Sequence, residues 1–166
     1  MRLNWTITIF AAALLTGCAT PPTATPVQVK ILAINDFHGN LKAPQGGIRI
    51  KDPADSTKTI NVPAGGAEQL ATAVAELRAK NPNHIFVAAG DLIGATPLLS
   101  ALFHDEPTVE ALGAMGLEVS SVGNHEFDKG ATELLRMQGG GCSPVDGCKG
   151  RSRSRARATG ISRRAR

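Results

Sequence analysis

Three short runs with strand-like patterns divide the chain, at residues 27–34, 85–89 and 118–122. The first run alternates and then becomes apolar, and the second is apolar on both faces, as the strands of a parallel sheet are. Segments with helical patterns separate the runs, so the order is strand, helix, strand, helices, strand, helix. This order predicts an α/β layer built on a parallel sheet.

The clearest helical pattern covers residues 67–80, where apolar side chains recur at the three-and-four spacing of one buried face. Pro82 should end this helix, because proline cannot continue the hydrogen-bond ladder. Further helices are predicted from Thr96-Pro97 and from Pro107, and Asp128 is predicted to cap the last one. Before the first helix, two short strand-like runs flank a polar stretch and predict a hairpin over residues 48–62.

The beginning of the chain has the composition of a targeting segment. Residues 1–17 combine a positive charge with a short apolar core, and Leu15-Thr16-Gly17-Cys18 resembles the lipobox of bacterial lipoproteins. The apolar core is shorter than the roughly 20 residues that cross a bilayer. We therefore expect a lipoprotein signal peptide, with Cys18 lipidated and residues 18–27 forming a proline-stiffened tether. A plain secretory leader and a short core helix are the alternatives.

Export changes the expectation for the other two cysteines. If Cys18 carries lipid, Cys142 and Cys148 remain as an even pair in an oxidising compartment, which predicts a small loop closed by a disulfide. Metal binding by these two thiols is the rival interpretation. It is weaker, because no further cysteine or histidine lies near them in the sequence.

The net charge of +4 comes from the end of the chain, where residues 151–166 contain seven arginines and no acidic residue. Without those arginines, 11 basic residues face 14 acidic ones, so the basic character is a property of the tail and not of the domain. We interpret the tail as out-of-frame or disordered sequence. An arginine-serine arm that binds nucleic acid or anionic lipid is the alternative, and we expect no nucleic-acid partner.

Polar residues with metal-binding chemistry follow each of the three predicted strands. Asp36-Phe37-His38 follows the first, Gly90-Asp91 the second and Gly123-Asn124-His125-Glu126 the third. In open α/β sheets, ligands gather beyond the carboxyl ends of the strands. Each cluster alone has a plainer explanation as a turn or a helix cap. Together they predict a site for divalent metal ions at one edge of the sheet.

These residues resemble the motifs of a known family. Asp36-x-His38, Gly90-Asp91-x-x-Gly94 and Gly123-Asn124-His125-Glu126 are similar, in order, to the motifs of the calcineurin-like metallophosphoesterases. The longer strings around the first and third clusters resemble the branch of bacterial 5'-nucleotidases and UDP-sugar hydrolases. The resemblance covers residues 28–150. It implies a parallel-sheet metallophosphoesterase sandwich, of which this chain holds the N-terminal part.

The resemblance also implies two divalent ions, zinc, manganese or similar. Asp36 and His38 would bind the first ion, Asp91 would bridge both, and Asn124 would bind the second. A bridging carboxylate suits this arrangement, because two neighbouring cations repel each other.

His125, paired with Asp128, would face the substrate phosphate in the implied mechanism. Metal-activated water would then hydrolyse a phosphate ester of a nucleotide. For Glu126, two roles remain open, contact with a metal ion or orientation of the loop backbone.

The family pattern continues with further histidine motifs, yet no histidine follows His125 in this sequence. We therefore expect the N-terminal part of an exported enzyme, with little or no activity of its own. A non-enzymatic surface lipoprotein with a vestigial metal site is the alternative. The sequence leaves open the substrate among mononucleotides, UDP-sugars and cyclic nucleotides, the metal and the oligomeric state.

Overall fold

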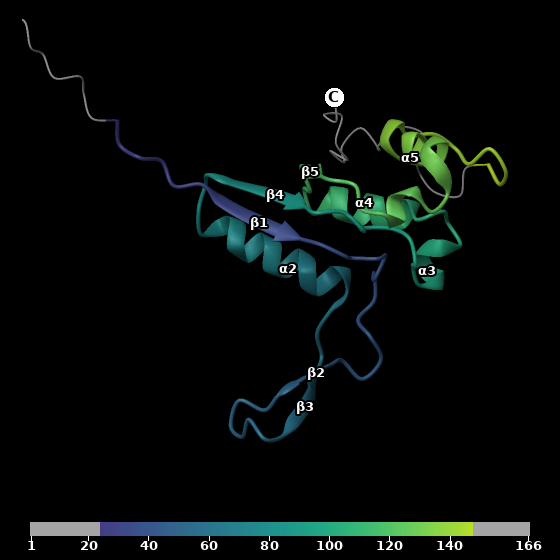
Figure 1. Cartoon of the computed structure of the whole chain (residues 1–166). Coiled ribbons are helices and arrows are strands. Elements are labelled where there is room, and N and C mark those ends of the chain that lie inside the picture. The colour runs from purple at the N-terminus through teal and green to yellow at the C-terminus, as the bar shows by residue number, and fades with distance from the viewer. Residues whose placement is uncertain (1–23, 148–166) are drawn as a thin grey trace, which may run out of the picture.

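A computed structural model describes residues 24–147, and these form a mixed α/β layer followed by a helical segment (Figure 1). The elements appear in the predicted order. They are β1 (Lys30–Ile34), β2 (Ile48–Lys51), β3 (Thr59–Val62), α2 (Gly66–Ala79), β4 (His84–Ala88), α3 (Leu98–Ala101), α4 (Glu106–Ala114), β5 (Val119–Ser120), the 3-10 turn η1 (His125–Phe127) and α5 (Gly130–Gly139).

The predicted parallel sheet is confirmed, with the strand order β1-β4-β5. Strand β1 pairs with β4 from Lys30↔His84 to Ile34↔Ala88. Strand β5 is shorter than predicted and pairs with β4 over only two residues. All three strands run in the same direction, so their carboxyl ends open at one edge of the sheet.

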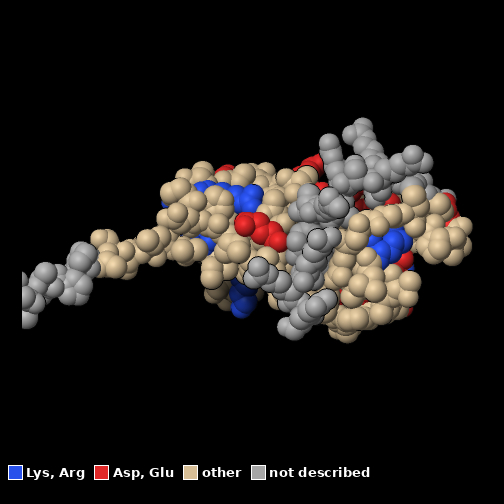
Figure 2. Space-filling view, turned by 90° about the horizontal axis from the view of Figure 1, so that it is seen from above, with Lys and Arg blue, Asp and Glu red and all other residues tan. Residues whose placement is uncertain are grey.

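The hydrophobic core lies on one face of this sheet. Leu32 and Phe86 are register partners on that face, and they pack in one cluster with Val74 of α2 and Leu112 of α4. Both helices therefore cover the same face. The crossovers from β1 to β4 and from β4 to β5 lead in the same direction across the sheet, and right-handed crossovers of this kind place their helices on one face. On the other face, Ile31 is 68% exposed. Seen from above, uncharged residues make up most of the described surface, with charged residues in small separate groups (Figure 2).

Two predicted helices differ from what the structure shows. Helix α2 forms where expected, but only Val74 on its predicted apolar face is fully buried, while Leu70 packs partly against the core and Leu77 is 39% exposed. Helix α3 has only four residues, and Leu98 and Leu102 stay exposed. Without burial of its apolar side chains, a longer helix gains little from packing.

The prediction that Asp128 caps the last helix was wrong. Lys129 occupies the N-cap position of α5, and no side chain caps that helix by a hydrogen bond. Asp128 instead ends the η1 turn and hydrogen-bonds to His125. The competing partner explains the difference, since an aspartate that accepts from an imidazole is not aimed at the first amides of the next helix.

The predicted hairpin is confirmed as the antiparallel ribbon β2–β3, which projects away from the sheet (Figure 1). Among the described residues, no helix is long and apolar enough to cross a membrane. Cys142 is disulfide-bonded. Cys148 and Cys18 lie outside the described residues, as do the predicted signal peptide and the arginine-rich tail.

Candidate metal centre

Backbone hydrogen bonds hold the loop after β1 against the loop after β4. The amides of Asp36 and His38 donate to the carbonyl oxygens of Gly90 and Asp91, both at 3.1 Å. The amide of Gly39 then donates to the carbonyl of Leu92 at 3.0 Å. The two loops thus continue the β1–β4 pairing beyond the sheet and place their side chains at the same edge.

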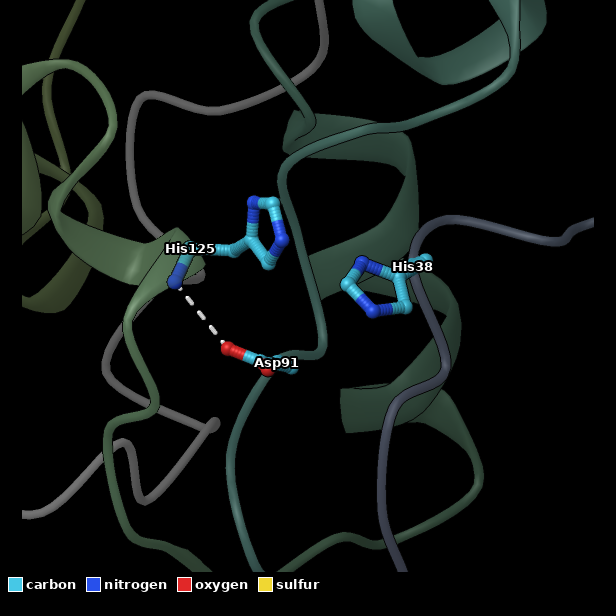
Figure 3. Close-up of side chains that lie close together, drawn as sticks. All are labelled: His38, Asp91 and His125. Carbon is cyan, nitrogen blue, oxygen red and sulfur yellow. Dashed lines mark hydrogen bonds between the residues drawn. The ribbon is translucent and has the colours of Figure 1, made fainter.

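Three candidate ligands meet at this edge. His38, Asp91 and His125 each offer a ligand atom within 4.8 Å of the others, and all three residues are half-buried. They come from the three loops that follow β1, β4 and β5 (Figure 3). The rings of His38 and His125 meet edge to face, with their centroids 4.9 Å apart.

The hydrogen bonding of His38 fixes which of its nitrogens can bind a metal. Its Nδ1 lies 2.8 Å from the carbonyl oxygen of Gly94. A carbonyl oxygen only accepts, so Nδ1 carries the proton and Nε2 keeps its lone pair. A ligating histidine usually donates its other ring N–H in this way, which fixes the orientation of the ring.

Asp91 is held in position by the loop that carries His125. The backbone N–H of His125 donates to Oδ1 of Asp91 at 3.0 Å, as the dashed line in Figure 3 shows. Asp36, His38 and Asp91 all have positive φ angles, of 50°, 45° and 52°. Non-glycine residues rarely adopt this conformation, and such strained residues gather at functional sites.

The remaining two predicted ligands are Asp36 and Asn124. Oδ1 of Asp36 is 3.7 Å from Nε2 of His38, and its side chain is 56% exposed. Asn35 donates to Oδ2 of Asp36 at 2.6 Å. Asn124 directly precedes the η1 turn and is exposed. Asp36 thus lies beside His38, whereas Asn124 is next to His125 in the chain.

His125 and Asp128 form a hydrogen-bonded pair, with Nδ1 of the imidazole 2.7 Å from Oδ2 of the carboxylate. This bond raises the pKa of His125 above its ordinary value. Partial burial lowers the same pKa, but by less. The geometry adds a contact that the sequence did not predict, because His125 also belongs to the group with His38 and Asp91.

Glu126 joins two of the loops through their backbones. Its side chain is buried, and its carboxylate accepts from the amides of Asp91, Leu92 and Gly123 at distances of 3.0, 2.8 and 2.6 Å. Of the two roles left open by the sequence, these contacts correspond to orientation of the backbone. No sequence pattern identified the donors Asp91 and Leu92, because they lie 35 and 34 residues from Glu126 in the chain and meet it only through the approach of two loops.

Glycines allow this close approach. A Cβ atom at Gly90 would lie 2.4 Å from the backbone nitrogen of Gly123. A Cβ atom at Gly123 would lie 2.1 Å from Oδ1 of Asp91. Neither position therefore tolerates a larger residue without displacing the site.

A pocket of about 130 Å³ adjoins His125. Asp128 and Lys129 line it together with apolar residues of α5, among them Leu134 and Met137. His125 therefore belongs both to the cluster with His38 and Asp91 and to the lining of this pocket.

The donor set fits a divalent metal. The imidazole of His38, whose Nδ1 donates to a carbonyl, lies with a second imidazole and a carboxylate so that one ligand atom of each is within 4.8 Å of the others. Nitrogen and oxygen donors of this kind accommodate zinc, manganese and similar ions. The site lies beyond the carboxyl ends of parallel strands, where α/β sheets gather ligands.

Comparisons with known proteins agree with this geometry. The model of the calcineurin-like phosphoesterase family matches residues 29–150. An uncharacterized protein from the pqq-V 5' region of Acinetobacter calcoaceticus is 46% identical over 140 residues, covering 80% of this chain and 69% of that protein. The 5'-nucleotidase of Bos taurus is 30% identical over 121 residues, covering 72% of this chain and 20% of that protein.

Among solved structures, the NAD nucleotidase of Haemophilus influenzae has a similar fold. It superimposes with a TM-score of 0.57 at 32% identity, covering 66% of this chain and 18% of that one. The chain therefore spans about a fifth of the length of either nucleotidase.

Proposed function

Because this chain belongs to the calcineurin-like phosphoesterase family, we propose that its site serves the metal-dependent hydrolysis of nucleotide phosphate esters. The meeting of His38, Asp91 and His125 beyond the ends of three parallel strands carries this proposal. The relatives named 5'-nucleotidase and NAD nucleotidase support nucleotides as the substrate class.

The proposed site holds two divalent ions. Asp36 and Nε2 of His38 would hold the first ion, Asn124 would hold the second, and Asp91 would serve both. Metal ions at such a site supply Lewis-acid activation of water and neutralise the charge of the phosphate. The bond from His38 to Gly94 supports this assignment, because it leaves Nε2 of His38 free to bind metal, 3.7 Å from Asp36. The positive φ angles of Asp36, His38 and Asp91 support it too, because such strain gathers at functional sites.

His125 and Asp128 act on the phosphate in this proposal. Asp128 orients the imidazole and stabilises its protonated form, so His125 can donate a hydrogen bond to a phosphate oxygen or a proton to the leaving group. Mutual orientation of this kind is typical of catalytic pairs. The pocket that His125 and Asp128 line offers room beside this pair.

Measurement of AMP hydrolysis with and without Mn²⁺ tests the proposal. Wild-type protein should release phosphate only with metal, and Asp91→Asn should remove most of that activity. Asp52→Asn, the same change on the β2–β3 turn, should have no effect, because Asp52 contacts only its own turn. Absence of both Mn²⁺ binding and metal-dependent hydrolysis in the wild type would contradict the proposal.

We further propose that this chain hydrolyses its substrate slowly. With His125 assigned to the phosphate, the proposed metal ligands among the described residues are Asp36, His38, Asp91 and Asn124, which is a small set for two tightly bound ions. Turnover should lie below about 1 per second, the low end for enzymes. Calorimetry separates this enzyme from a non-enzymatic surface lipoprotein: two bound ions support the enzyme, and one weak ion or none supports the lipoprotein.

For location, we propose export and attachment to the bacterial membrane through lipid on Cys18. The residue pattern of positions 1–27 supports this proposal. In cells, Cys18→Ser should move the protein from the membrane fraction to the soluble fraction. An unchanged distribution would contradict lipidation at this cysteine.

A further inference from the structure

We propose that Glu126 is a positioning residue that fixes the carboxylate of Asp91 in the metal centre without contacting metal itself. This inference rests on the proposed function, because it assigns Asp91 a role in metal binding. It extends that function by naming the group that holds the bridging ligand in place.

The first observation is the set of partners of the Glu126 carboxylate. The residue is 5% exposed, and its two oxygens accept three backbone N–H groups. Oε2 accepts from both Asp91 and Gly123, and Oε1 accepts from Leu92. Both oxygens are thus engaged by amides of the loops and point at backbone.

The second observation is that the backbone of Asp91 and Leu92 is bound on both sides. Their amides donate to Glu126, while their carbonyl oxygens accept from His38 and Gly39 of the first loop. Residues 91–92 therefore lie between the other two loops. Without the hydrogen bonds to Glu126, residues 91–92 would be held only by the first loop, and the carboxylate of Asp91 would lose part of its support.

The third observation is a reciprocal bond between the same two loops. Glu126 accepts from the amide of Asp91, and Asp91 in turn accepts from the amide of His125. Each loop thus supplies a carboxylate to the backbone of the other. Because one oxygen of Asp91 is engaged in this way, the direction of its second oxygen follows from the position of the η1 turn.

A carboxylate suits this role better than an amide side chain. Three donors converge on Glu126, and an ionised carboxylate is an acceptor at both oxygens. A glutamine has the same size but offers one acceptor and one NH₂ group. In Glu126→Gln, either the Leu92 amide or the amides of Asp91 and Gly123 would face another donor, so the positive φ of Asp91 would lose support.

Hydrogen exchange of the metal-free protein tests the inference directly. In the wild type, the amides of Asp91, Leu92 and Gly123 should be protected. In Glu126→Gln, the amides that face the new NH₂ group, either that of Leu92 or those of Asp91 and Gly123, should exchange at least tenfold faster, while Phe86 in β4 should keep its protection. Glu110→Gln on the exposed surface of α4 is the matched control and should change none of them.

Metal binding in a double-mutant cycle tests whether Glu126 acts through Asp91. Glu126→Gln should weaken Mn²⁺ binding by about 10- to 100-fold, as loss of an outer hydrogen-bonding partner typically does. In an Asp91→Asn background, the same change should add almost nothing, because the ligand that Glu126 positions is already impaired. A structural role unrelated to Asp91 would give the same loss in both backgrounds.

The outcomes separate this inference from the proposed function. If the wild type binds no Mn²⁺ but Glu126→Gln shows the predicted faster exchange, the metal centre is contradicted and the positioning of Asp91 by Glu126 stays supported. Unchanged exchange in a folded Glu126→Gln protein, or equal losses in both backgrounds, overturns the inference. If Glu126→Gln does not fold, Glu126→Asp replaces it. The aspartate keeps both acceptor oxygens but is one methylene shorter, so the amides should again exchange faster and Mn²⁺ binding should again weaken only when Asp91 is present.

Discussion

Nδ1 of His38 donates a hydrogen bond to the carbonyl oxygen of Gly94, at a distance of 2.8 Å across 56 residues of sequence. This bond ties the loop after β1 to the far end of the loop after β4. It also sets the tautomer, so that Nε2 of His38 is available toward Asp36 and the other ligands. One contact thereby determines both the position and the tautomer of a candidate ligand.

Removal of the His38 imidazole should weaken metal binding. His38→Ala should raise the dissociation constant for Mn²⁺ by at least about tenfold, the lower end for a change at a metal site. His84→Ala is the matched control, since Nδ1 of His84 also bonds to a carbonyl oxygen, at the start of β4 and away from the cluster. Titration calorimetry should find unchanged affinity for the control, and similar affinities in both variants would show that His38 is not a ligand.

A methyl group at Gly123 should disrupt the centre. In Gly123→Ala, the new Cβ would lie 2.1 Å from Oδ1 of Asp91, so the carboxylate or the loop must move. We expect a clear loss of Mn²⁺ affinity. Gly139→Ala at the end of α5 meets no atom within 4 Å and should change the free energy of unfolding by less than about 1 kcal/mol. Calorimetry measures the metal affinity and urea unfolding the stability of both variants. Normal Mn²⁺ binding by Gly123→Ala would contradict the steric argument.

The ion pair between Glu133 and Arg136 should make part of the stability depend on pH. The hydrogen bond from Arg136 lowers the pKa of Glu133 below its ordinary value. A lowered folded-state pKa stabilises the fold above the unfolded pKa, and this contribution is lost as pH falls through the folded value. At neutral pH, Glu133→Gln should therefore lower the free energy of unfolding by about 1 kcal/mol.

Below the folded-state pKa of Glu133, wild type and Glu133→Gln should have similar stabilities. Urea unfolding at several pH values measures this difference. A difference that stays constant from neutral to strongly acidic pH would show that the pair contributes no pH-dependent stability.

The one-sided core should depend on a few large side chains. Leu112 of α4 is 1% exposed and packs in the main cluster with Phe86 of the sheet and Val74 of α2. Leu112→Ala should cost about 2–5 kcal/mol in the free energy of unfolding. Leu135, which is 66% exposed on α5, is the control, and its change to alanine should stay within about 0.5 kcal/mol. Equal losses in the two variants would contradict this account of the core.

The sequence by itself determined the order of the elements and the residues available for the site. Apolar runs and helical spacing are local properties, so β1, α2, β4 and α4 form close to where these patterns place them. The polar clusters after the strands followed from the same patterns, because parallel strands end at one edge. For this reason Asp36, His38 and Asp91 could be assigned to one centre before their distances were known.

Only the tertiary structure decided how these residues meet. The contact of His125 with His38 and Asp91, the bond of His38 to Gly94 and the three amides on Glu126 all join segments far apart in the chain. No local pattern encodes such contacts. The short β5 and α3 have the same origin, since the extent of each element depends on what packs against it. Local periodicity fixes which residues stand at the ends of strands, whereas the approach of loops, permitted by Gly90 and Gly123, fixes which of their atoms can act together.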